Sequence, residues 1–137
     1  MRSVIVHLKN ADIEGVKDLL EGRYTAQEDQ WIGWVNQDPC LYIAIYTHLL
    51  EEASEDELTG LKQRLGKLPS VSLIADISGR HHGGPQVVAF VSLLLERFEG
   101  VATDDYSDDL WTLEEIVSQA LKVRGKEKRE FFSHFWH

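Results

Sequence analysis

The stretch that decides the fold runs from Leu73 to Ile116, LIADISGRHHGGPQVVAFVSLLLERFEGVATDDYSDDLWTLEEI. Its pattern predicts, in order, an apolar strand at 71–77, a glycine-rich loop at 78–84, an apolar helix from Pro85, a short strand at 101–103, an acidic loop, and a helix from Thr112. Thr112 and Glu115 have the spacing of a capping box. The unusual polar residues gather in the two loops, and such loops are where function tends to lie.

Outward from this stretch, the periodicity predicts a strand at 4–8, a helix capped by Asp12, a strand at 40–46 and a helix capped by Ser54. The segment 23–38 fits either a short helix or a strand or hairpin arm. The order of elements therefore alternates strands with helices, which implies crossover connections. We expect a single α/β domain over residues 1–137, with about four strands in a mostly parallel or mixed sheet covered by helices.

Composition narrows the class of protein. The chain has 137 residues, 43% hydrophobic and 27% charged, as in an ordinary globular domain. Its sequence has no apolar run of about 18 residues and no convincing signal peptide. The single cysteine, Cys40, fits a buried hydrophobe in a reducing compartment, so a cytoplasmic protein is expected. The net charge of −9 disfavours nucleic acid and membrane surfaces and favours a basic partner.

The glycine-rich loop is the first candidate site. Arg80, His81 and His82 precede a predicted helix N-terminus, where free N–H groups and the helix dipole favour an anion. The spacing matches neither the P-loop nor the dinucleotide-binding pattern. The alternative is a simple connection whose glycines adopt positive φ. Adjacent histidines without further ligands do not predict a metal site, and the other histidines, His7 among them, are interpreted as structural or exposed.

The acidic loop is the second candidate site. Aromatic side chains among carboxylates suit recognition of a cationic protein surface, because the rings supply buried area and the charges steer association. The proposed contacts are Asp104, Asp105, Tyr106, Asp108, Asp109 and Trp111. The loop fails the EF-hand template, because its sixth residue is Asp109 rather than glycine. The alternative is a solvated loop that caps the next helix while Trp111 packs in the core.

The run DISGRHHGG…FVSLLLERFEGVATDDYSDDLWTLEEI resembles segments of small uncharacterised bacterial proteins of the toxin-immunity type. The resemblance implies a cytoplasmic protein that binds a basic toxin and occludes its active site. No cofactor is expected. A non-enzymatic binding protein is therefore the favoured hypothesis, although the sequence does not decide whether there is catalytic activity. Two alternatives stay open: an anion- or small-molecule-binding protein or enzyme that uses the Arg80–His82 loop, and a homodimer formed through Trp31, Trp34 or the terminal aromatic segment.

Overall fold

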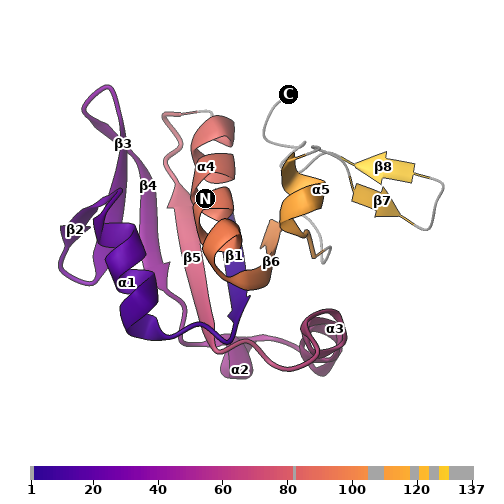
Figure 1. Cartoon of the computed structure of the whole chain (residues 1–137). Coiled ribbons are helices and arrows are strands. Elements are labelled where there is room, and N and C mark those ends of the chain that lie inside the picture. The colour runs from indigo at the N-terminus through magenta and orange to yellow at the C-terminus, as the bar shows by residue number, and fades with distance from the viewer. Residues whose placement is uncertain (1, 82, 105–109, 118–120, 124–126, 130–137) are drawn as a thin grey trace.

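The computed structural model describes residues 2–81, 83–104, 110–117, 121–123 and 127–129 (Figure 1). Its elements in chain order are β1 (Arg2–Lys9), α1 (Ile13–Glu21), β2 (Thr25–Gln27), β3 (Gln30–Val35), β4 (Asp38–Ile45), α2 (Leu49–Glu52), α3 (Glu55–Leu65), β5 (Val71–Ile77), α4 (Gly84–Arg97), β6 (Glu99–Asp104), α5 (Leu113–Val117), β7 (Leu121–Val123) and β8 (Glu127–Arg129). No helix in the described ranges is long and apolar enough to cross a membrane.

The described residues form a six-stranded sheet in the order β2-β3-β4-β5-β1-β6, and β7 pairs separately with β8. Every neighbouring pair in the large sheet is antiparallel. β1 lies between β5 and β6, with Val6 opposite Leu73 on one side and Ala102 on the other. The two strands joined by α4 are therefore parallel to each other but are separated by an antiparallel strand, an arrangement known as a split βαβ unit.

The predicted sheet of about four mostly parallel or mixed strands is wrong, as is the strict alternation of strands and helices. A helical crossover does join parallel strands, but β1 is inserted between β5 and β6 and makes each adjacent pair antiparallel. The ambiguous segment 23–38 contributes β2, β3 and the start of β4, a meander of hairpins. Asn36 and Gln37, with φ of 50° and 70°, form the tight turn that joins β3 to β4.

The main core lies between one face of the sheet, here called the helix face, and the helices α1 and α4 (Figure 1). Strand alternation sends Val4, Val6 and Leu8 of β1 to this face, and all three are fully buried. Phe90 and Leu94 of α4 pack into the same core. Cys40 is also fully buried there, as its position beside an apolar run predicted.

The opposite face of the sheet, here called the open face, carries the alternate residues of the same strands. A smaller core covers one part of it, where Leu61 and Leu65 of α3 pack against Val101 of β6. α3 begins at the predicted cap, since the hydroxyl of Ser54 accepts from the backbone N–H of Glu57 at 3.2 Å. These contacts fix α2 and α3 over the open face, and a cavity remains between them and the sheet.

Candidate functional site

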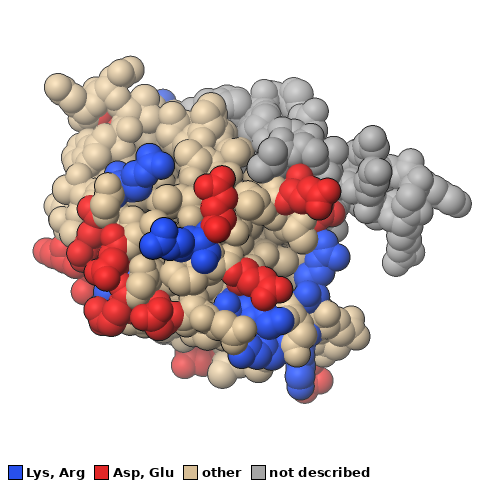
Figure 2. All heavy atoms as spheres, viewed as in Figure 1, with Lys and Arg blue, Asp and Glu red and all other residues tan. Residues whose placement is uncertain are grey.

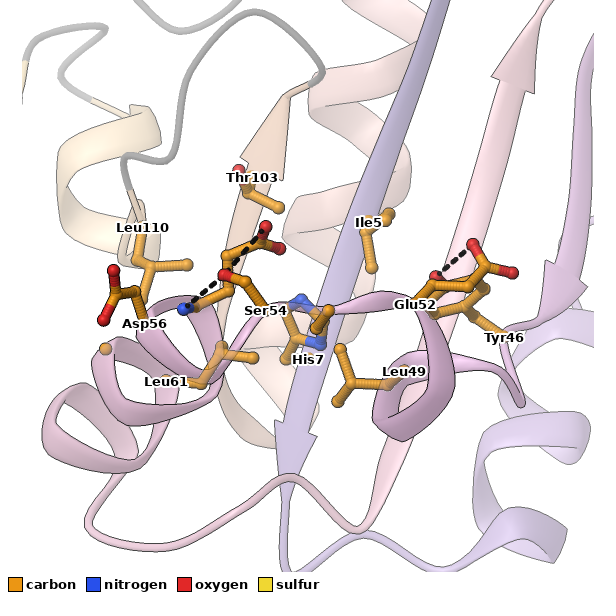
Figure 3. Close-up of a pocket in the computed structure, with 13 residues that line it drawn as sticks. Ile5, His7, Tyr46, Leu49, Glu52, Ser54, Asp56, Leu61, Thr103 and Leu110 are labelled. Atoms are coloured by element: carbon orange, nitrogen blue, oxygen red, sulfur yellow. Dashed lines mark hydrogen bonds between the residues drawn. The ribbon is translucent and has the colours of Figure 1, made fainter.

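The cavity has a volume of about 420 Å³, within the usual range of about 300–1,000 Å³ for small-molecule sites. Its floor comes from β1 and β6, and its walls and rim come from the segment 49–61, here called the α2–α3 arm. Figure 3 shows His7 at the centre, with Glu52 on one side and Asp56 on the other. The lining residues are Ile5, His7, Tyr46, Leu49, Glu52, Ala53, Ser54, Asp56, Glu57, Gly60, Leu61, Thr103 and Leu110.

His7 is the polar group on the cavity floor. It is only 3% exposed, because β5 and β6 flank its strand and the α2–α3 arm lies above it. Nδ1 of its ring lies 2.8 Å from the hydroxyl oxygen of Ser72, its partner across the β1–β5 pair. Burial lowers the pKa of His7 to about 4, so the ring is neutral at pH 7. Nε2 has no hydrogen-bond partner among the described residues and is available to an occupant of the cavity.

The rim of the cavity is negatively charged. Glu52, Asp56 and Glu57 are exposed carboxylates of the α2–α3 arm, and the described lining contains no Lys or Arg. The hydroxyl of Tyr46 donates to Glu52 at 3.0 Å. Partial burial, this hydrogen bond, and the charges of Glu52 and Glu57 together raise the pKa of Tyr46.

The helix face carries charges of both signs (Figure 2), whereas the charged residues at the cavity rim are carboxylates. Figure 2, viewed from the side that carries α1 and α4, shows acidic side chains gathered at the edge that carries α1, and acidic and basic side chains interspersed over the rest of that surface. Mixed charges of this kind are typical of a solvated protein surface. The described lining of the cavity instead has three carboxylates and no Lys or Arg, and carboxylates without nearby cations create a negative potential that attracts cations.

Two residues that flank the acidic segment predicted as a partner-binding site line this cavity. Thr103 and Leu110, the residues on either side of the segment 104–109, both line it. Asp104 is the last residue of β6, and its backbone pairs with Val4. The remaining predicted contacts of the loop, Asp105, Tyr106, Asp108 and Asp109, lie outside the described residues.

The aromatic residues singled out in the sequence differ in exposure. Trp111 is fully buried, and its ring packs in the main core rather than on the surface, while its backbone forms an isolated bridge with Ala102. Trp31 is 6% exposed, whereas Trp34 is 49% exposed and donates its indole N–H to Thr25. The terminal aromatic segment, 131–136, lies outside the described residues.

The residues of the predicted anion site face a carboxylate. Nη2 of Arg80 lies 3.0 Å from Oδ1 of Asp38, and Nε2 of His81 lies 2.7 Å from Oδ2 of the same side chain. An anion at this loop would have to compete with Asp38 for both groups. His82 lies outside the described residues. Gly83 has a φ of 82°, which agrees with the alternative that the loop uses glycine for a positive φ.

The loops after β5 and β6 leave the same end of the sheet. Ile77 of β5 and Asp104 of β6 lie opposite residues 2 and 4 of the intervening β1. Since neighbouring strands are about 4.8 Å apart, β5 and β6 are separated by about 10 Å. The ends of the two strands that precede the candidate sites are thus near each other, but Arg80 and His81 do not belong to the described lining of the cavity.

Sequence reasoning missed most of the cavity. The signal available was His7, a titratable residue at an inward position of an apolar strand, and the five acids within residues 51–57. Within the described part of the chain, no group of three or more His, Cys, Asp or Glu side chains is arranged to hold a metal ion. Comparisons with protein-family models, with curated proteins and with solved structures found no match to this chain.

Proposed function

We propose that this protein binds a basic protein partner and does not catalyse a reaction. The observation that carries the proposal is the cavity on the open face, with three carboxylates at its rim and no cationic side chain in its described lining. Four further aspartates lie in the sequence segment 104–109, whose flanking residues Thr103 and Leu110 line the same cavity. Concentrated negative charge steers a basic partner and fixes its orientation.

The resemblance to immunity-type proteins suggests what this partner is. A basic toxin that acts on nucleic acid has an active site suited to phosphates, and a row of carboxylates can occupy such a site in their place. The proposed mechanism is occlusion of that active site in the cytoplasm, where a single reduced cysteine is expected.

The test compares two variants that lose the same number of charges. The rim variant carries Glu52→Gln, Asp56→Asn and Glu57→Gln, whereas the control variant carries Glu14→Gln, Asp18→Asn and Glu21→Gln on the exposed side of α1. Each tagged protein is used to capture partners from a lysate of its source organism, and the affinity for the captured protein is then measured by calorimetry at two salt concentrations.

We expect the wild type and the control variant to capture the same basic protein, with affinity that falls as salt rises. The rim variant should bind it at least about tenfold more weakly, because interfacial charges are lost. Equal affinity of the rim and control variants would refute the proposed site. The absence of any basic partner, or a partner that is not basic, would refute the proposed function.

A further inference from the structure

The cavity has features beyond a general negative charge. Its polar lining groups can all accept a hydrogen bond, and they come from separate elements: His7 from β1, Glu52 from α2, and Asp56 and Glu57 from α3. Leu49 and Leu61 supply apolar walls between these polar groups (Figure 3). A matching occupant has an alkyl stem, a positive charge and several N–H donors that point in different directions.

We propose, resting on the function proposed above for the identity of the partner, that this cavity binds one alkylguanidinium group, such as an arginine side chain. A guanidinium has five N–H donors in a planar fork and no acceptor, which suits a site made of acceptors on several elements. Its alkyl stem lies against Leu49 and Leu61, and its head donates to the rim carboxylates and to Nε2 of His7. A lysine ammonium has only three donors and is more strongly hydrated.

The buried histidine is the independent observation that points to a ligand. A rim of acids alone is compatible with a solvated surface, and Glu55, Asp56 and Glu57 also interact favourably with the N-terminus of α3. His7, however, is almost completely buried, with Nδ1 engaged by Ser72 and Nε2 without a described partner. When Nδ1 carries the proton and donates to Ser72, Nε2 is an acceptor for the occupant. The lowered pKa of His7 keeps the ring from repelling a cation at neutral pH.

The first experiment measures binding of a small probe to the free protein. n-Butylguanidinium is titrated into isotopically labelled protein, and the ring signals of His7 are followed by NMR. n-Butylurea, which has nearly the same shape but no charge, is the matched control ligand. We expect saturable shifts of the His7 signals with butylguanidinium and at least tenfold weaker binding of butylurea. Equal binding of the two, or no saturable shift with butylguanidinium, would overturn the proposal.

Two variants separate the cavity from the surrounding charge. Gly60 lines the cavity and a Cβ there would meet nothing within 4 Å, so Gly60→Leu has room for its side chain, is designed to fill the cavity, and removes no charge. The variant Glu52→Gln/Glu57→Gln removes charge and leaves the cavity open. We expect both to weaken butylguanidinium binding at least tenfold, while Glu14→Gln/Glu21→Gln on α1 leaves it unchanged. Full binding by Gly60→Leu would overturn the assignment to this cavity.

The Gly60→Leu variant also identifies the source of the guanidinium group. If the partner protein inserts an arginine, Gly60→Leu lowers affinity for the partner as the rim variant does. If the partner binds Gly60→Leu at full strength but not the rim variant, the proposed function stands and the arginine insertion is refuted. If butylguanidinium still binds the wild type in that case, the occupant of the cavity is a free small molecule. Failure of the probe and failure of partner capture are therefore distinct results.

Discussion

Acidification should destabilise this protein through His7. The ring is buried, and its pKa is lowered from 6.5 to about 4 by desolvation. In the unfolded chain the same ring takes up a proton near its ordinary pKa, so the unfolded state binds more protons in this window. The contribution of His7 is fully present above about pH 6.5, is lost progressively as the pH falls toward about 4, and changes little below that value.

The size of the effect follows from the pKa difference. At about 1.36 kcal/mol for each pKa unit, the lowering corresponds to about 3 kcal/mol, with about 2 kcal/mol already lost by about pH 5. This is a large part of the typical free energy of unfolding of a domain, about 5–15 kcal/mol. Solvent screens this effect only weakly, because His7 is only 3% exposed.

The assay is urea unfolding of the wild type and of His7→Gln from about pH 8 to about pH 4. Glutamine does not titrate but retains hydrogen-bonding groups for Ser72. The carboxylates that face the cavity, Glu52, Asp56 and Glu57, are common to both proteins, so their titration largely cancels in the difference. We expect the wild type to lose about 3 kcal/mol relative to the variant over this range. A difference that stays constant with pH would refute the reasoning.

Four further stability changes can be measured by urea unfolding at neutral pH. Gly83→Ala should destabilise by about 2 kcal/mol, because φ is 82° and the new Cβ would lie 2.5 Å from Ile77; an unchanged midpoint would contradict this. Gly60→Ala should instead stabilise by about 0.5–1 kcal/mol, because it lies in a helix with open space around the new methyl group; a loss of stability would show that the space is filled. Ser54→Ala should cost about 1 kcal/mol through loss of the α3 cap, and Ser54→Asp should restore it. Phe90→Ala should cost about 3–5 kcal/mol, because the ring is fully buried; a cost below about 1 kcal/mol would place it outside the core.

Local signals in the sequence identified most helices and strands correctly. Asp12 and Ser54 cap α1 and α3, and the alternation of Val4, Val6 and Leu8 marks the buried face of β1. These signals are reliable because capping and strand alternation depend on residues only a few positions apart. The segment 23–38 stayed ambiguous, because its tryptophans are equally compatible with a helix and with a hairpin.

Strand order and direction could not be read from the chain. A helix between two strands indicates that they are parallel, but not whether a third strand lies between them, and here β1 pairs with β5 across more than sixty residues of sequence. The same long-range pairing places Ser72 beside His7. The candidate cavity is a product of that pairing together with the packing of α3 on β6.

The sequence by itself determined the net negative charge, a chain length typical of one domain, the helix caps and the apolar faces of the helices and strands. Each of these depends on composition or on residues close together in the chain. Only the tertiary structure decided that the sheet is antiparallel, that Asp38 meets Arg80 and His81, and that Trp111 is buried. It also decided that a scattered histidine becomes the floor of an acid-rimmed cavity. Each of these results depends on which distant segments share a face, and that is set by the packing of the whole sheet against its helices.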